Sequence, residues 1–406
     1  MNRSIKDKRF FLFLLTCALS CAGARAVEIE PVVNVSLLGG QFFFEGERTS
    51  FSGNGDWLGA AGMKFNDRFS LIPTVTGKYR RVREVQELIG GGFLTQETLE
   101  NQALIKGIYT LSDRWKAKLK GTFKNQMLVE SESEKLGKGL YDNNKLGFGL
   151  EFERTGTVMK SMRFGLDPYA VRFIHYTYLA SGSSFGSEIE SGVNTLDFNA
   201  YDGSWGADWA LGGKTTLSAN TLASYRPYPD QKRVTSSGGY LPQNRSDWYG
   251  EAGMSLLQAL PDISSARLQW LSGLDISYAA LVSDQHNYDA PRTRFNPGYY
   301  DYAETHLAPK LAGRFFGDLD WALVYDYCVR NYNHRPIQDT DGTYGADKIV
   351  LTTHSISYSL KYPLGMGIAV VAQGVYRQSK SNMAYEKTYR YNYTAQHYFA
   401  GVSWEY

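Results

Sequence analysis

The chain has 406 residues, with 43 Lys and Arg against 41 Asp and Glu, so its formal net charge is only +2. This balance lacks the bulk basicity typical of nucleic-acid binding, and no nucleic-acid partner is expected. Aromatic residues make up 14% of the chain, Tyr (29) and Gly (41) are frequent and Pro (12) is sparse, a mixture that favours many long β-strands.

The first 26 residues have the pattern of a secretory signal peptide. A basic head precedes an apolar run from Phe10 and the small-residue sequence Ala24-Arg25-Ala26. The apolar run is too short for a membrane-spanning helix. Without 1–26, which hold five basic residues and one acidic residue, the net charge changes from +2 to −2. Cys328 is then the single cysteine of 27–406, which we expect to form one domain without a disulfide.

From residue 27 onward, long alternating segments are separated by very short turns and by longer polar loops. The clearest case is 115–124, where Trp115 and Phe123 share one face and Lys116, Lys118 and Lys120 share the other. A row of three lysines requires water on its side of the sheet. The pattern therefore predicts a sheet with one wet face and one apolar face.

The connections predict the strand count. Short turns are expected at 66–68, 112–114, 155–157, 204–207, 261–264, 317–319 and 363–365, and longer loops near 46–55, 83–97, 131–141, 178–192, 227–245, 286–300, 333–347 and 380–389. These connections imply about sixteen strands of roughly 12 to 20 residues, longer than the ~5–6 residues of globular strands. Both ends of the barrel segment fall on the short-turn side. The fold class predicted is all-β, a transmembrane antiparallel up-and-down β-barrel, and a soluble β-sandwich does not fit the wet inner face.

Aromatic residues are expected to form two girdles at the membrane surfaces. The short-turn girdle would contain Trp115, Trp209, Trp321 and Trp404, and the long-loop girdle would contain Tyr79, Trp248, Tyr278, Tyr302 and Tyr389.

The chain ends on "YFAGVSWEY", in which Tyr398, Ala400, Val402, Trp404 and Tyr406 share one face of a strand. This ending resembles the C-terminal assembly signal of Gram-negative outer-membrane β-barrel proteins, although the usual last residue is Phe. The resemblance implies an outer-membrane location, with lipid and the barrel-assembly machinery as partners. Porins, exporters, enzymes and adhesins share this signal, so it identifies no subfamily.

The expected functional surface is the lumen wall. A basic strip is predicted on the second to fifth strands, formed by Lys64, Lys78, Arg80, Lys106, Lys116, Lys118, Lys120 and Lys124. Inward acidic residues are expected elsewhere, at Glu151, Glu153, Glu251, Asp275 and Asp326. A basic strip that faces acidic residues across a lumen produces a transverse field. We expect weak anion selectivity from it, and a constriction from lumen side chains or from loop 227–245.

These features predict a channel for passive diffusion of small hydrophilic solutes, without a cofactor or a resident metal. The alternative is an assembly, export or surface-attachment barrel that binds a protein or a polysaccharide. A hydrolase is disfavoured, because His354 and Ser355 lie on opposite faces of a strand. The carboxylates of Asp339, Asp341 and Asp347 do not complete a calcium-loop spacing and fit a turn. The solute and the oligomeric state are left open.

Overall fold

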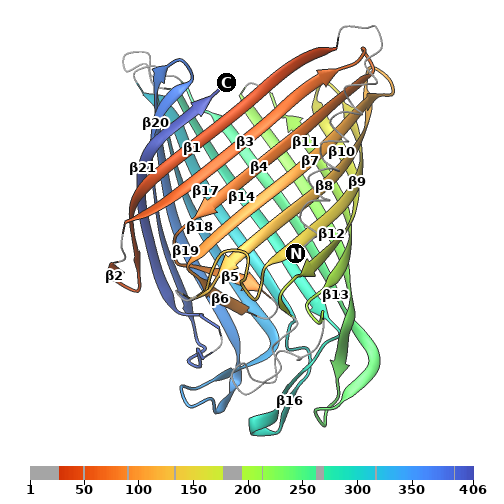
Figure 1. Cartoon of the computed structure of the whole chain (residues 1–406), viewed down its shortest axis with the longest axis vertical. Helices are drawn as coiled ribbons and strands as arrows, with labels where there is room; N and C mark the ends of the chain where they lie inside the picture. The colour runs from red at the N-terminus through yellow and green to blue at the C-terminus, as the bar shows by residue number, and fades with distance from the viewer. Residues whose placement is uncertain are drawn as a thin grey trace.

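The computed structural model describes residues 27–48, 51–88, 91–131, 134–176, 194–212, 214–261, 269–315, 318–387 and 389–406. The predicted signal peptide, 1–26, lies outside the described residues. Within the described part of the chain, sixteen antiparallel strands form one closed barrel (Figure 1). No helix in these ranges is long and apolar enough to cross a membrane.

The wall strands follow one another around the barrel in chain order. They are β1 (Glu28–Phe44), β3 (Ser52–Lys64), β4 (Phe69–Arg80), β7 (Glu97–Thr110), β8 (Trp115–Val129), β9 (Asn143–Thr155), β10 (Met159–Phe173), β11 (Phe198–Ala210), β12 (Thr215–Val234), β13 (Tyr240–Ala259), β14 (Gln269–Ser283), β17 (Tyr302–Phe315), β18 (Leu319–Gln338), β19 (Tyr344–Gly365), β20 (Ile368–Ser381) and β21 (Tyr393–Glu405). The loops contain β2 (Glu47–Arg48), β5 (Glu84–Leu88), β6 (Gly91–Thr95), β15 (Asn287–Asp289), β16 (Arg294–Asn296) and a 3₁₀ turn, η4 (Ala290–Arg292).

The first and last wall strands close the barrel. Val35 of β1 lies opposite Trp57 of β3 on one side and opposite Trp404 of β21 on the other. The main chains of Val33 and Tyr406 exchange two hydrogen bonds of 2.8 Å. Closure pairs the edge amides that hydrocarbon could not solvate. Both ends of the wall lie with the short turns, as predicted (Figure 1).

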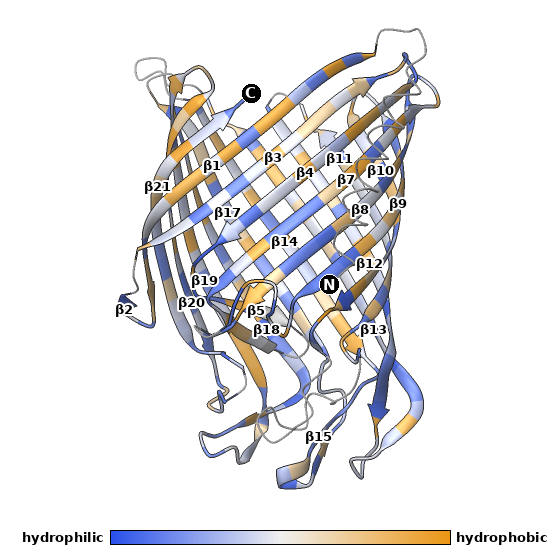
Figure 2. Cartoon of the chain, in the orientation of Figure 1, coloured by the Kyte–Doolittle hydropathy of each residue, from blue (hydrophilic) through white to orange (hydrophobic). Residues whose placement is uncertain are grey.

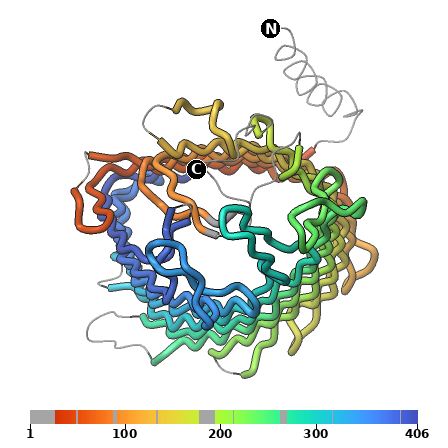
Figure 3. The backbone as a smooth tube through the Cα atoms, turned by 90° about the horizontal axis from the view of Figure 1, so that it is seen from below, coloured from red at the N-terminus to blue at the C-terminus, as the bar shows by residue number. Residues whose placement is uncertain are grey.

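The β5–β6 hairpin identifies the inner face of the wall. Its Val85 and Leu94 pack against buried Leu38 and Phe42 of β1, and Figure 3 shows this hairpin (orange) inside the ring of strands. Leu37, on the other face of β1, is 60% exposed. The same alternation continues around the wall, and apolar bands alternate with hydrophilic ones along the strands in Figure 2. The architecture is that of an outer-membrane β-barrel, with its apolar side chains exposed outward.

Most of the predicted girdle residues lie on the outer face. On the short-turn side, Trp321 packs with Phe315 and Trp270 at ring-centroid distances of 5.3 and 5.4 Å. The prediction is wrong for two residues of the other girdle. Tyr302 lies in register between Leu281 and Tyr332, which are both buried on the inner face of the wall, so it faces the lumen. Tyr389 is buried in a loop cluster.

The C-terminal motif is outward-facing. Tyr398, Val402, Trp404 and Tyr406 are 42%, 49%, 40% and 71% exposed. On the opposite face of β21, Phe399 is buried against the inner wall. This arrangement places the predicted assembly residues on the lipid-facing side of the strand that closes the barrel.

Two short turns lie further along the chain than predicted. Residues 204–207 are inside β11, and the turn follows at Gly212, where φ is +94°. The glycines of "DGSWGAD" suggested a turn, but Gly203 and Gly206 lie in the strand ladder, opposite Ala223 and Asn220 of β12. The last short turn is formed by 365–367, with positive φ at all three residues, rather than by 363–365.

Candidate functional site

The predicted basic strip lies on the lumen side of β3, β4, β7 and β8. The register places Asp56 opposite Lys78, and Lys106 opposite Lys120. The positions that alternate with these residues carry exposed apolar side chains, such as Leu119 at 50%. The lumen set contains all eight cations named from the sequence: Lys64, Lys78, Arg80, Lys106, Lys116, Lys118, Lys120 and Lys124.

Several of these cations are paired along the wall. Lys118 Nζ lies 2.6 Å from Glu151 Oε1 and 2.9 Å from Glu153 Oε2, both on the neighbouring strand β9. The remaining pairs are Arg80–Asp56 (2.7 Å), Lys120–Asp167 (2.7 Å), Lys124–Glu100 (2.6 Å) and Lys64–Asp67 (3.3 Å). Glu151 and Glu153 therefore do not face the basic strip across the lumen, as the sequence had suggested; they neutralise part of it from the side.

Gly149 makes one of these pairs possible. It lies on β9 between Lys120 of β8 and Asp167 of β10, and its register partner is Lys120. A Cβ atom at Gly149 would meet Asp167 Oδ1 at 2.0 Å and Lys120 Cε at 2.3 Å. The missing side chain lets an ion pair form across an intervening strand.

Three lysines of the strip keep their charge uncompensated at short range. Within the described chain, Lys78, Lys106 and Lys116 have no carboxylate oxygen within 4.0 Å that forms an ion pair. They lie on β4, β7 and β8, which are consecutive in the wall. The positive field of this side of the lumen therefore arises mainly from these three side chains.

The opposite side of the lumen is acidic. Since pairing follows chain order, β13, β14, β17 and β18 lie eight strands away from β3, β4, β7 and β8 in a sixteen-strand barrel. A recess of about 370 Å³ in this wall is lined by Glu251, Asp275, Glu304 and Asp326, together with His306. The predicted acids Glu251, Asp275 and Asp326 thus do face the basic strip.

The acids in the recess differ in their partners. Asp275 accepts two hydrogen bonds of 2.8 Å from Lys310 Nζ, so its charge is compensated. Glu251 accepts a hydrogen bond from the Tyr249 hydroxyl at 2.9 Å, and Asp326 Oδ1 lies 3.6 Å from His306 Nδ1. Glu251 therefore has no basic partner among the described residues, whereas the field of Asp326 depends on the charge of His306.

Four further residues line this wall and were not predicted from the sequence as lumen residues: Glu304, His306, Cys328 and Arg330. Period-two counting places Glu304 and His306 on one face of β17, and Cys328 and Arg330 on one face of β18. Their proximity depends on the inter-strand register, which pairs His306 with Cys328. That register cannot be read from the sequence of one strand.

The alternative sites considered from the sequence have ordinary structural explanations. His354 is on the outer face, where its Nδ1 lies 2.7 Å from the Tyr325 hydroxyl, and Ser355 faces the lumen beside Asp326. Asp341 accepts hydrogen bonds from the amide and hydroxyl of Thr343 at 2.8 and 3.0 Å, as in an Asx turn. The first contact joins two neighbouring wall strands, and the others stabilise a turn.

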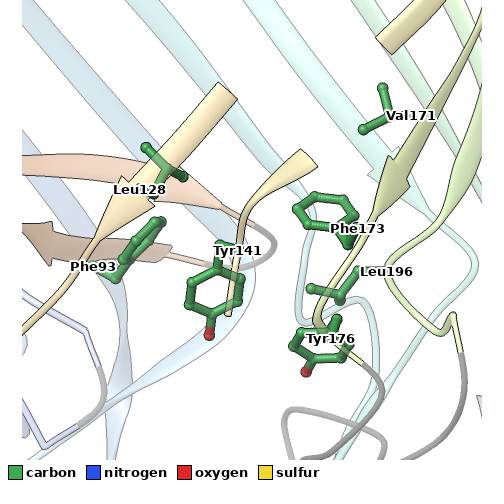
Figure 4. Close-up of a cluster of buried hydrophobic side chains, with 7 residues drawn as sticks. All are labelled: Phe93, Leu128, Tyr141, Val171, Phe173, Tyr176 and Leu196. Carbon is green, nitrogen blue, oxygen red and sulfur yellow. The ribbon is translucent and has the colours of Figure 1, made fainter. Parts of the chain in front are cut away.

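The loops fold into the long-loop mouth of the barrel. The β5–β6 hairpin carries Phe93, whose ring centroid lies 4.7 Å from that of Tyr141, and both belong to a buried cluster (Figure 4). The other members are Leu128, Val171, Phe173, Tyr176 and Leu196. The hairpin thus contacts the β1–β21 seam through Val85 and Leu94, and the β8–β10 side through Phe93. It extends into the mouth between these two contacts (Figure 3).

This hairpin replaces the expected constriction. The segment 227–245 is a hairpin rather than an irregular loop: β12 ends at Val234, β13 begins at Tyr240, and a tight turn joins them. Inside the wall outline, Figure 3 also shows the teal segment around 284–301, whose Tyr299 and Tyr300 are buried against Leu281. The loops that narrow the mouth are those whose apolar side chains pack against the wall. Period-two counting on the wall strands does not detect these contacts.

A buried arginine joins the other loops. Arg335 is 1% exposed, and its guanidinium lies over the rings of Tyr299, Tyr332, Tyr389 and Tyr391 at 4.1 to 5.6 Å. Arg335 also donates a hydrogen bond of 2.5 Å to the Tyr391 hydroxyl. Cation–π contacts of this kind are strengthened by desolvation. They connect the 284–301 loop, β18 and the 382–392 loop.

No protein-family model and no curated protein matches the chain. Among solved structures, it is similar to OmpT of Vibrio cholerae, an outer membrane protein in its in-vitro folded trimer form (11% identity, 94% of this chain and 100% of that chain, TM-score 0.47). It is also similar to OccD3 (OpdP) of Pseudomonas aeruginosa (7%, 95% and 93%, TM-score 0.46) and to the FrpB iron transporter of Neisseria meningitidis (8%, 91% and 68%, TM-score 0.46). At these identities and scores the likenesses carry no functional argument.

Proposed function

We propose that this protein is a channel in the outer membrane of a Gram-negative bacterium, through which small hydrophilic solutes diffuse passively. The observation that carries the proposal is the polarised lumen: Lys78, Lys106 and Lys116 face a wall that contains Glu251 and Asp326. An aqueous lumen of sixteen strands is wider than side chains alone normally fill. The exposed apolar outer face and the aromatic girdle support insertion in a bilayer.

The charges of the two walls determine which solutes pass most readily. The Debye length is about 10 Å in about 0.1 M salt, so a wall charge acts on an ion that passes within about this distance. A solute with separated positive and negative groups can be aligned by the transverse field. Weak anion preference is expected to come from Lys78, Lys106 and Lys116, since Lys118, Lys120 and Lys124 are paired.

The test is the reversal potential of the refolded protein in a planar bilayer under a low-salt gradient. Lys106→Glu and Lys116→Glu together should shift the potential toward cation preference, and the shift should fade as salt rises. Lys214→Glu is the matched control, because Lys214 is exposed next to a short turn. It lies beyond the wall strands, carries the same charge change as either single lumen substitution, and should leave the potential unchanged.

Each outcome decides between the candidate functions. A shift confined to the lumen variants supports the channel and its basic wall. Conductance without any shift would mean that these lysines do not face the permeation path. Absence of conductance in a correctly folded barrel would remove the channel proposal and favour a barrel that binds or exports a macromolecule.

A further inference from the structure

Four side chains from two neighbouring strands meet on the acidic wall of the lumen. Glu304 and His306 lie two residues apart on β17, and Asp326 and Cys328 lie two residues apart on β18. His306 is the register partner of Cys328, so their side chains project from directly opposite positions on the same face. What distinguishes this point from the other polar contacts of the wall is the thiol.

The distances place nitrogen, oxygen and sulfur donors together. His306 Nε2 lies 2.8 Å from Glu304 Oε1, and His306 Nδ1 lies 3.6 Å from Asp326 Oδ1. Glu304, His306 and Cys328 can each offer one ligand atom, and these atoms all lie within 4.8 Å of one another. In the described ranges, no other group of three His, Cys, Asp or Glu side chains has this geometry.

We propose that this cluster binds a divalent transition-metal ion of the zinc class. Zinc takes thiolate, imidazole and carboxylate ligands at about 2.0–2.3 Å, usually in tetrahedral geometry. Three ligands would come from Cys328, His306 and Glu304, and the fourth position opens onto the recess that Asp326 also lines. The thiol and imidazole donors disfavour calcium and magnesium, which take oxygen ligands.

The surroundings orient the ligands and attract cations. Arg330 Nε donates a hydrogen bond of 2.6 Å to Glu304 Oε2, which leaves Oε1 directed at His306. Such an outer contact fixes a carboxylate ligand in place. The positive charge of Arg330 disfavours a bound metal ion, whereas the negative charges of Glu251 and Asp326 in the same recess favour it. This site is independent of the proposed channel activity.

The test is metal binding by the whole refolded barrel, stripped with a chelator and kept reduced. Titration calorimetry should find one Zn²⁺ per chain, and Co²⁺ should give thiolate-to-cobalt charge-transfer absorption. Cys328→Ser and His306→Ala should each weaken binding at least about tenfold, the scale seen when the support of a metal ligand is lost. His354→Ala is the matched control, because His354 lies on the outer face, and should bind as the unaltered chain does.

A second measurement uses the unaltered chain alone, so it does not depend on the folding of a variant. Cys328 is partly accessible and is the single cysteine beyond the predicted signal peptide. Zn²⁺ should slow its alkylation by a small aqueous maleimide, and a chelator should restore the rate. Mg²⁺ and Ca²⁺ should have no effect. Alkylation that is insensitive to Zn²⁺, or Zn²⁺ binding that survives both substitutions, would overturn the proposal.

Discussion

Replacement of Leu119 by Arg should strongly destabilise the barrel, because this side chain faces the middle of the bilayer. Leu119 is 50% exposed and follows Trp115, a girdle residue, by four positions on β8. Four residues extend about 13 Å along a strand, which a tilt of about 40° reduces to roughly 10 Å across the membrane. That depth is near the centre of an apolar band about 25 Å tall. Its outer-face register partners, Gly107 and Leu150, offer no carboxylate.

The expected cost is about 2–4 kcal/mol, the range for an outward arginine at the bilayer midplane. Reversible guanidinium unfolding in lipid vesicles measures this change in free energy of unfolding. Val158→Arg is the control: Val158 is 67% exposed but lies in a short turn beyond the wall strands, where the cost falls to about 0–1 kcal/mol. If both substitutions had equal cost, the assignment of the outer face to hydrocarbon would be refuted.

Three further predictions concern the ends and loops of the barrel. Deletion of 404–406 removes the pairing of Trp404 with β1 and should lower the yield of heat-modifiable barrel in the outer membrane; a normal yield would contradict a role in assembly. Burial and the charge of Glu134 raise the pKa of Glu130 to about 7, above its usual 4.5, so its stabilising contribution is complete below about pH 4.5 and is lost as the pH rises through 7. Hydrogen exchange of the 130–142 loop should therefore quicken between pH 5.5 and 8 beyond the intrinsic pH effect, and Glu130→Gln should abolish this excess. Arg335→Lys should cost about 1–2 kcal/mol by weakening its tyrosine contacts, and should make the 382–392 loop more sensitive to protease while the wall stays folded.

Period-two alternation was sufficient to predict the wall, because every wall strand has one lipid face and one lumen face. It placed Lys116 inward and Leu119 outward, and the number of connections predicted sixteen strands, as the structure has them. Turn composition was less reliable. Gly206 lies in a strand, paired with Arg163 of β10 and Asn220 of β12, and a glycine alone does not indicate whether it belongs to a turn or a strand.

The site was predicted only in part, because its electrostatics depend on contacts between strands. The sequence indicates that Lys118 and Glu151 point inward, but only the register shows that they are 2.6 Å apart. Likewise, the alternation that places Cys328 in the lumen does not indicate that His306 lies opposite. The loops that enter the mouth are held by clusters drawn from distant segments, so no local pattern predicts them.

The anchoring of the β5–β6 hairpin has a consequence for the order of assembly. Its cluster combines Leu38 of β1 with Phe399 of β21, two residues that meet only after nearly the whole chain has been laid into the wall. Contacts between such distant segments form late. The hairpin can dock completely only after β1 has paired with β21, and it then contacts both strands from inside the barrel. Separation of β1 from β21 would have to disrupt this apolar cluster as well as the backbone hydrogen bonds between the two strands. The segment that narrows the mouth therefore also stabilises the closed barrel.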